Sequence, residues 1–455
     1  MTGKQVLRAI FWTQAGVNFI GALGPELSFD ALWYHLPIAR LLAERGWWGV
    51  IPGGLLYTSG LPRLMEFVNA LLLFVGQRVG LESPELLPKL LSFGIGLACA
   101  SMIFKITRRF ASETSAWGAV VLWYTTLVVG WQTIVVYVDL ARTLATLISV
   151  WYFLEKDWFR SAVFIGCAYA IKNFAGVDAV FMSLAWYFSY GDWKRGVKFF
   201  VVFAGLAGIW GIANILQSYP FFYPVGSYYS ISEHVVWNFP RILGPIWETL
   251  NPSIRVGPVT PIILWLSWKN IRRVGKLRPL IVMVGALLLS WYIVPRSWDG
   301  RYFLPTLSIM GVLAMSGLDK HLNKSKYSLV MGLVILQGLG GVIYRGAANT
   351  KFVPYVLGLE TKANFLAKKL NFEFGDWYDS DGWVKENLAD KQYLVRGVHN
   401  IYYLPGVLWD HESWADKQKC YPYVLIQGES GVSEGERLVH SIAETKTRIY
   451  ETSCF

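Results

Sequence analysis

The sequence is poor in charge and lacks the common nucleotide-binding and zinc-protease signatures. Only 16% of its 455 residues are charged, whereas soluble globular chains carry about 25%, which excludes a soluble enzyme, a disordered chain and a coiled coil. It contains no Gly-x-x-x-x-Gly-Lys-Ser/Thr loop, no Gly-x-Gly-x-x-Gly fingerprint, no His-Glu-x-x-His and no paired Cys-x-x-Cys. ATP-driven transport, Rossmann-type use of nucleotide sugars and zinc proteolysis therefore lose support.

Cysteine is also scarce, with four residues in the whole chain. Cys99 and Cys167 lie in apolar segments, and Cys420 and Cys454 lie in the polar C-terminal part. The last two could pair in an oxidising compartment. Two unpaired thiols agree with the sequence equally well.

Hydrophobic and aromatic residues are abundant instead. They make up 54% and 16% of the chain, with 22 Trp and 24 Tyr, and such rings collect at membrane–water interfaces. The net charge of +11 divides into +14 for residues 1–345 and −3 for residues 346–455. Because the positive-inside rule explains the basic excess, the sequence predicts a polytopic protein of the lipid bilayer and no nucleic-acid partner.

Apolar stretches mark the predicted membrane spans, each of which needs roughly 20 residues. A stretch at 161–190 is interrupted by Lys172, Asn173 and Gly176 and therefore predicts two short helices joined by a polar apex. A short span is predicted at 256–268. The other stretches lie near residues 7–23, 86–104, 114–131, 137–154, 197–215, 279–294, 301–317 and 327–344.

Residues 61–79 are ambiguous, because counting them as a span inverts every later loop. If they lie along the membrane instead, 18 of the 30 Lys and Arg residues in 1–345 fall in six short segments on one face, as the positive-inside rule requires. We therefore predict an all-α domain at 1–345 with eleven spans, a cytoplasmic N-terminus and a first outer loop at 24–85.

Residues 346–455 form the second predicted domain, which is small, extracytoplasmic and of the α/β class. A helical pattern at 361–370 alternates with β-like runs at Tyr393–Val395 and Tyr423–Ile426.

Ionisable residues at membrane depth are functional candidates by default, because each costs about 2.5 to 3.5 kcal/mol on insertion scales. Asp30 follows the first span, and its alternative role is a helix N-cap. Asp139 opens a later span, where the alternative is an i, i+3 ion pair with Arg142. Lys172 lies at the hairpin apex near Asp178, and the alternative there is snorkelling to the interface.

A second group of charges, Arg296, Asp299 and Arg301, lies in a short outer loop next to Tyr302. Two guanidinium groups beside aromatic rings suit a phosphate near the headgroup level. Ordinary interfacial anchoring is the alternative.

Several motifs occur in the order that is found in one known superfamily. They are Asp30-x-x-x-Tyr34-His35-Leu36-Pro37, Leu61-Pro62-x-x-x-Glu66, Tyr137-Val138-Asp139, Gly166 to Lys172, Tyr223-Pro224 and Arg301-Tyr302-Phe303-Leu304-Pro305. Over residues 5–345 the chain resembles the GT-C superfamily of integral membrane glycosyltransferases, in particular the branch with protein O-mannosyltransferases and the bacterial aminoarabinose transferase.

The resemblance implies transfer of a sugar from a polyprenyl-phosphate donor, usually with inversion, to an acceptor of unknown kind on the outer face. Asp30 would be the general base and Asp139 the second acidic residue. The donor phosphate would be held by Lys172, Arg296 and Arg301. Substrate contacts would come from Tyr34, His35, Glu66, Asp299 and Tyr302.

A divalent cation, Mg or Mn, at Asp30 stays open. Asp30 and His35 alone are too few ligands to define a metal site. Several members of the family that the chain resembles have an adjacent acidic pair where this sequence has Phe29-Asp30.

Two other classes of function agree with a polytopic chain that carries intramembrane charges. One is a transporter or flippase of lipid-linked glycans, although the sequence shows no internal repeat and its charges lie at span ends. The other is a noncatalytic assembly protein that acts through residues 346–455.

Overall fold

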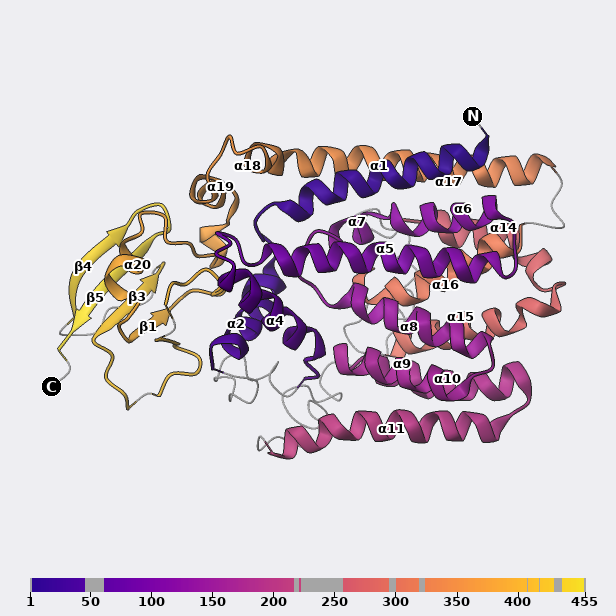
Figure 1. The fold of residues 1–455 in the computed structure, drawn as a ribbon, viewed down its shortest axis with the longest axis horizontal. Helices are drawn as coiled ribbons and strands as arrows, with labels where there is room; N and C mark the ends of the chain where they lie inside the picture. Colours follow the sequence, from indigo (N-terminus) through magenta and orange to yellow (C-terminus); the bar gives the residue numbers. More distant parts are fainter. Residues whose placement is uncertain are drawn as a thin grey trace, which may run out of the picture. The chain divides into compact units, whose positions relative to one another are not determined.

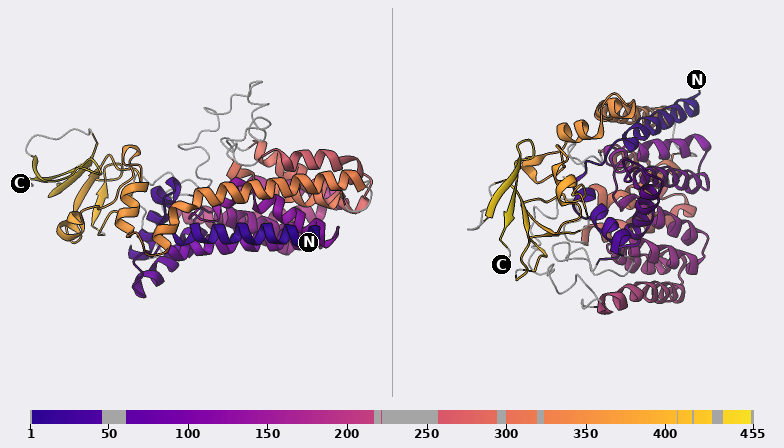
Figure 2. Two further views of the ribbon diagram at one scale, coloured as in Figure 1. Left: turned by 90° about the horizontal axis from the view of Figure 1, so that it is seen from above. Right: turned by 60° about the vertical axis from the view of Figure 1, so that its left-hand side comes forward.

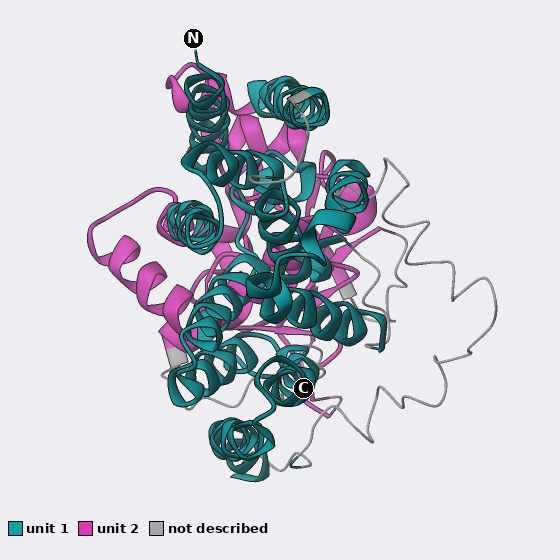
Figure 3. Ribbon diagram, turned by 90° about the vertical axis from the view of Figure 1, so that its right-hand side faces the viewer, with its two compact units in different colours: residues 1–22, 61–65, 89–351 teal, residues 23–60, 66–88, 352–455 magenta. Residues whose placement is uncertain are grey.

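The computed structural model of the chain describes residues 2–45, 61–216, 221, 257–293, 300–318, 324–406, 408–416, 418–428 and 436–453. It is mostly helical, with a small sheet near the C-terminus (Figure 1). The chain forms two compact units, coloured separately in Figure 3. Unit 1 contains residues 1–22, 61–65 and 89–351, and unit 2 contains residues 23–60, 66–88 and 352–455.

Unit 1 is built from apolar helices. They are α1 (Gly3–Leu23), α5 (Leu86–Arg108), α6 (Glu113–Tyr124), α7 (Leu127–Gln132), α8 (Asp139–Leu154), α9 (Trp158–Ile171), α10 (Ala175–Tyr190), α11 (Trp193–Leu216), α14 (Val259–Ile271), α15 (Arg278–Ile293), α16 (Leu304–Ser316) and α17 (Lys324–Asn349), with short 3-10 turns at Gly275–Leu277, Gly300–Phe303 and Thr350–Phe352.

The helices of unit 1 pack in pairs. Helix α8 packs on α9, α9 on α11, and α10 on α15, while α16 contacts both α6 and α14. Helices α1 and α17 lie side by side in Figure 2. Their contact includes the Asn349 side-chain amide, which donates to the Val17 carbonyl at 2.9 Å.

Helices occur at every predicted span of residues 1–345. The stretch 161–190 is divided as predicted, because Lys172 is extended (φ −153°, ψ 121°) between α9 and α10. The stretch 114–131 is broken between α6 and α7. Five helices of the described part are long and apolar enough to cross a membrane, namely Gly3–Leu23, Leu86–Arg108, Trp193–Leu216, Gly275–Ile293 and Ser325–Val356. The count of eleven crossings stays a prediction.

Unit 2 contains the helices of the predicted first outer loop. A five-residue π-helix, η1 (Ala31–His35), continues into α2 (Leu36–Arg45), and α4 (Leu64–Arg78) follows later in the loop. Helix α4 falls within the ambiguous residues 61–79, and its course along the membrane stays a prediction.

The C-terminal part of unit 2 has the predicted α/β character. Its helices are α18 (Val353–Val356), α19 (Lys362–Lys369), a 3-10 turn at Phe372–Phe374 and α20 (Trp383–Leu388). The strands are β1 (Tyr393–Arg396), β2 (Trp409–His411), β3 (Tyr423–Gln427), β4 (Glu436–Ile442) and β5 (Thr447–Thr452), in the order β2-β1-β3-β5-β4. Strand β1 is parallel to β2 and β3, whereas β5 is antiparallel to β3 and β4.

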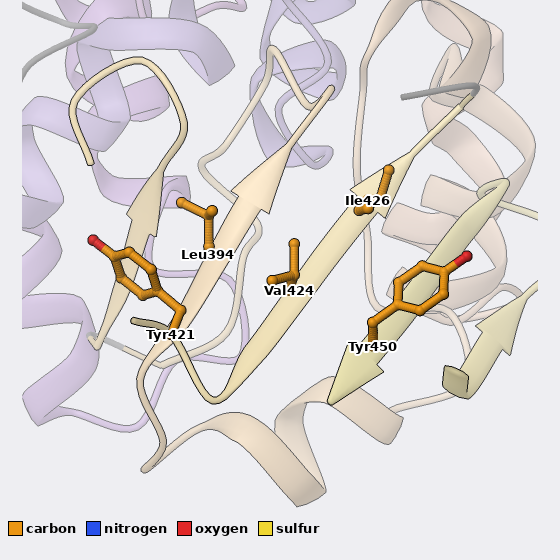
Figure 4. Close-up of a cluster of buried hydrophobic side chains, with 5 residues drawn as sticks. All are labelled: Leu394, Tyr421, Val424, Ile426 and Tyr450. Carbon is orange, nitrogen blue, oxygen red and sulfur yellow. The ribbon is translucent and has the colours of Figure 1, made fainter. Parts of the chain in front are cut away.

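One face of this sheet carries a buried apolar cluster (Figure 4). Val424 and Ile426 are two residues apart on β3, so they point to the same face. Leu394 on β1 and Tyr450 on β5 flank them, and Tyr421 completes the cluster. This packing accounts for the β-like runs in the sequence. Of the two C-terminal cysteines, Cys420 is disulfide-bonded, and Cys454 lies outside the described residues.

Candidate functional site

A buried ion pair joins Asp139 and Lys172. Asp139 is the first residue of α8, and Lys172 follows the last residue of α9. Because the two helices pack as an antiparallel hairpin, the start of α8 and the end of α9 meet. Lys172 Nζ lies 2.6 Å from Asp139 Oδ1, and the two side chains are 13% and 2% exposed. The positive end of α8 adds to the stabilisation of the carboxylate.

Aromatic rings and a second cation surround this pair. Lys172 Nζ lies 4.3 Å from the centre of the Tyr302 ring, and Phe174 meets the same ring edge-on at 5.0 Å. Arg301 donates to the Tyr302 hydroxyl at 3.0 Å, and its guanidinium also lies 5.4 Å from the centre of the Tyr137 ring. We call Asp139, Lys172, Arg301 and Tyr302 the charge cluster. Its two cations and one carboxylate leave a net positive charge.

Arg142 does not pair with Asp139, so this alternative for Asp139 is wrong. Its guanidinium bonds to Asp178 Oδ2 on α10 at 2.6 Å, and the Ser290 hydroxyl on α15 donates to Asp178 Oδ1 at 2.5 Å. All three residues are buried. Asp178 can take both bonds because α10 packs against α15. The snorkelling alternative for Lys172 is also wrong, because its ammonium is taken by Asp139.

Asp30 directly precedes the π-helix η1. Its backbone is helical (φ −61°, ψ −32°) and its side chain makes no capping hydrogen bond, so the N-cap alternative is wrong. The Tyr34 hydroxyl donates to Asp30 Oδ2 at 3.4 Å, so the two side chains lie on one face of this segment. Asp30 is 9% exposed. Single π-helical turns are rare and frequently occur at functional sites.

His35 and Glu66 form the second pair of the predicted substrate-binding residues. His35 Nδ1 lies 2.6 Å from Glu66 Oε1, and both side chains are buried. The pair ties the end of η1 to the first turn of α4.

The predicted phosphate-binding residue Arg296 and the predicted substrate-binding residue Asp299 lie outside the described residues. The structure places the other predicted residues in two groups, each within its own unit. Asp139, Lys172, Arg301 and Tyr302 are brought together in unit 1. Asp30, Tyr34, His35 and Glu66 are brought together in unit 2.

Within the described part of the chain, no group of three or more His, Cys, Asp or Glu side chains could hold a metal ion. Mg²⁺ keeps several waters and is commonly bound through one or two carboxylates together with substrate phosphates. A cation at Asp30 therefore stays a prediction.

Two solved structures of other proteins are similar to this chain over most of its length. The chain matches ArnT from Cupriavidus metallidurans bound to undecaprenyl phosphate, with a TM-score of 0.63 and 12% identity over 97% of this chain and 97% of that chain. It also matches the oligosaccharyltransferase AglB from Archaeoglobus fulgidus in complex with an inhibitory peptide and a dolichol-phosphate. That TM-score is 0.55, with 11% identity over 93% of this chain and 69% of that chain.

The chain shares the fold of these two structures. The GT-C fold that the resemblance implies is thereby confirmed. No protein-family model and no curated protein matches the sequence.

Sequence reasoning singled out the charge cluster but missed the role of Asp178 and Ser290. Asp178 carries the same signal as Asp139, since it is an acidic residue inside an apolar stretch. Ser290 carries no comparable signal, because serine is common in membrane helices and its partner lies 112 residues away.

Proposed function

We propose that this chain is a glycosyltransferase that takes a sugar from a polyprenyl-phosphate donor and transfers it to an acceptor hydroxyl with inversion. The observation that carries the proposal is the charge cluster, in which a fully buried carboxylate holds one of two cations beside aromatic rings. The solved ArnT structure with the same fold is bound to undecaprenyl phosphate, which is a ligand of the proposed class.

The reaction needs one proton acceptor and one site for a leaving phosphate. In the proposed step the acceptor oxygen bonds to the anomeric carbon of the sugar, and the bond from that carbon to the phosphate oxygen breaks. Asp30 takes the proton of the acceptor hydroxyl as general base. The polyprenyl phosphate leaves with the electron pair, so that a base and a leaving group on opposite faces of the sugar give inversion.

The charge cluster would stabilise the negative charge that grows on the phosphate. Arg301 offers a planar fork of donors, and Lys172 offers a compact ammonium, with Arg296 as a further proposed donor. Asp139 holds the ammonium of Lys172. Its other oxygen, Oδ2, is buried and has no hydrogen-bond partner among the described residues, so it can accept a hydroxyl of the substrate.

The predicted substrate-binding residues are assigned by their nearness to Lys172 or to Asp30. The Tyr302 ring lies over the Lys172 ammonium, and Asp299 lies three residues before Tyr302 in the sequence. Tyr34 touches the proposed base directly, whereas His35 and Glu66 are assigned to the acceptor side through their position after Asp30.

The proposed setting is a cell membrane with eleven crossings and a cytoplasmic N-terminus. Residues 1–345 would supply the catalytic membrane domain and residues 346–455 an extracytoplasmic domain. Five long apolar helices and the shared fold support a membrane location. The first-loop helices belong to the same compact unit as the C-terminal region.

The test is sugar transfer by the purified protein in lipid nanodiscs, with a panel of labelled polyprenyl-phosphate sugars and mixed acceptors. We expect wild type to release the carrier phosphate and to transfer the label from one of these donors. Asp30→Asn should lower the rate by about 10²- to 10⁴-fold, the usual contribution of general-base catalysis. Asp390→Asn, an exposed site of the same chemistry, should not change the rate.

Two results would contradict the proposal. Full transfer by Asp30→Asn would remove Asp30 from the base role. Movement of intact lipid-linked sugar across proteoliposomes, with no transfer from any donor, would identify a flippase instead.

A further inference from the structure

A turn of the C-terminal region packs directly on the helix that follows Asp30. We name residues Tyr402–Gly406 the docking turn. Within unit 2 it contacts η1, α2 and both ends of the first-loop segment. Several of these contacts use backbone groups of the turn, so residue identity in the turn does not reveal them.

The first contact supplies a hydrogen-bond donor that the π-helix lacks. In η1 the Leu36 N–H bonds to the Ala31 carbonyl, five residues back. The next carbonyl in this register belongs to Leu32, and its donor would be residue 37, which is a proline without an N–H. The Tyr402 N–H donates to the Leu32 carbonyl at 3.2 Å. A buried carbonyl without a donor costs about 1 to 3 kcal/mol. The Tyr402 N–H of the docking turn therefore takes the place of the N–H that Pro37 lacks.

The second contact is a clamp made by Arg40 on α2. Its guanidinium donates to the carbonyls of Tyr402 at 3.2 Å and Leu404 at 2.5 Å, and also to the carbonyl of Gly406. Its Nε donates to Glu44 at 2.8 Å. The planar fork of arginine is suited to several acceptors at once, whereas lysine offers a single point charge.

Gly406 fits this clamp for a backbone reason. Its φ is +73°, and a Cβ at this position would overlap the carbonyl oxygen of Ala389. Only glycine therefore allows the carbonyl of residue 406 to face Arg40 without strain. The turn is also held from the sheet side, because the Tyr393 hydroxyl donates to the Pro405 carbonyl at 2.7 Å.

The third contact lies at the other end of the loop. Glu85 is 1% exposed and accepts from the hydroxyls of Tyr402 and Tyr403, both at 3.4 Å. Lys362 pairs with the same carboxylate at 2.9 Å. The Tyr403 hydroxyl also lies 2.9 Å from the Glu26 carbonyl and donates to it. Burial beside Glu85 raises the pKa of both tyrosines well above the ordinary value, so both hydroxyls stay protonated as donors.

We infer that the docking turn positions Asp30 for the transfer reaction, with Arg40 and Tyr402 as positioning residues. The inference rests on the proposed function, in which Asp30 is the base. Asp30 directly precedes the π-helical turn, so the direction of its carboxylate follows the geometry of Ala31–His35. The docking turn completes the hydrogen bonds of that geometry and holds the following helix through Arg40. The C-terminal region thus acts on the reaction through the backbone of the first loop.

The test compares two variants that loosen the docking turn with a matched control. Arg40→Ala removes the clamp from the loop side, and Gly406→Ala displaces one clamped carbonyl from the C-terminal side. Gly428→Ala is the control, because Gly428 also has a positive φ of +77° but nothing lies near its missing Cβ. Arg40→Lys keeps the charge and loses the fork.

The kinetic readout separates positioning from binding. Since a small misplacement of a reacting group costs up to about 100-fold, we expect Arg40→Ala and Gly406→Ala to lower kcat by about 10- to 100-fold, with KM for the donor changed less than about 2-fold. Arg40→Lys should recover only part of the loss. The acid limb of the pH profile of kcat/KM, which reports the base, should shift in both loosened variants and stay in place in Gly428→Ala.

Hydrogen exchange gives a readout that does not need activity. The Leu36 and Tyr402 amides should exchange faster in Arg40→Ala and Gly406→Ala than in wild type and Gly428→Ala. Wild-type kcat in the loosened variants would overturn the inference, and so would a lower kcat with unchanged exchange at both amides. Absence of transfer in wild type would instead overturn the proposed function, while the exchange experiment would still test the docking itself.

Discussion

The two groups of candidate residues are stabilised in different ways. In unit 1 two buried carboxylates are each met by a cation from another helical element, as Asp139 is met by Lys172 and Asp178 by Arg142. In unit 2 the turn after Asp30 is held by backbone groups, with Arg40 and the Tyr402 N–H bound to carbonyl oxygens. An apolar environment requires charge to be cancelled, whereas a loop can be fixed by completing its backbone hydrogen bonds.

This difference predicts which property of each group, stability or activity, a single substitution changes first. Removing one partner of a buried pair leaves an uncompensated charge, so unit 1 should respond to single substitutions in stability as well as in activity. The turn after Asp30 carries no buried charge pair with the docking turn, so its variants should lose geometry and rate before they lose the fold.

The largest expected stability effect comes from breaking the charge cluster. Lys172→Met leaves Asp139 buried without its cation, and we expect a loss of about 3 to 5 kcal/mol in the free energy of unfolding. The double variant Asp139→Asn with Lys172→Met removes both charges and should regain most of that stability while staying inactive. Reversible unfolding in mixed micelles measures both values.

Lys369→Met is the control for this experiment, because Lys369 is exposed on α19. It should unfold like wild type. A double variant that is as unstable as Lys172→Met would show that the unpaired charge is not the source of the loss. Cancellation of buried charge would then not be what stabilises this group in unit 1.

The sequence predicts the elements of this fold well where apolar patterning decides them. The division of 161–190 at Lys172, the helix near 361–370 and strands β1 and β3 all follow from local pattern. The ion-pair partner of each buried charge is harder to predict from the sequence. Arg142 lies one turn from Asp139 in sequence, but in the fold its guanidinium pairs with Asp178 on α10 instead. Nothing local encodes that choice, because it depends on which helices become neighbours.

The docking turn was not predictable for a different reason. Arg40 binds carbonyl oxygens, which every residue has, so no residue type marks its partners. Pro37 is the one local signal, since a proline six residues into a helical segment leaves an earlier carbonyl without a donor. The sequence shows that a donor is missing there but not that Tyr402, 365 residues later, supplies it.

A smaller effect on stability is expected from Ser290, the uncharged member of the Arg142–Asp178–Ser290 network in unit 1. The Ser290 hydroxyl bonds to a charged carboxylate at 2.5 Å, and such bonds contribute about 1.5 to 3 kcal/mol. Ser290→Ala should therefore lower the free energy of unfolding by that amount. Ser183→Ala on α10 is the matched control, because that hydroxyl bonds only to the Val180 carbonyl of its own helix.

If Ser290→Ala and Ser183→Ala unfold alike, Asp178 is satisfied by Arg142 alone. The network would then be a simple ion pair, and the contrast between charge cancellation in unit 1 and backbone completion in unit 2 would become sharper.

The smallest effect is a pH dependence in unit 2. His411 on β2 donates from Nε2 to the Val398 carbonyl at 2.7 Å and accepts at Nδ1 from the Ser413 N–H at 3.1 Å. Burial lowers the pKa of His411 below its ordinary value, although the bond to Val398 and the nearby Glu412 oppose the shift and His399 adds to it. The folded state therefore binds fewer protons than the unfolded state in mildly acidic solution.

Stability that depends on neutral His411 is complete above the ordinary histidine pKa and falls as the pH decreases below it. We expect amide exchange in β1 and β2, corrected for its intrinsic pH dependence, to accelerate between pH 7.5 and 5.5 in wild type and less so in His411→Gln. An equal acceleration in both proteins would assign the effect to other groups. Because both ring nitrogens of His411 are bound to its own sheet and turn, this response should leave the Leu36 amide unaffected, which separates loosening of the sheet from loosening of the docking turn.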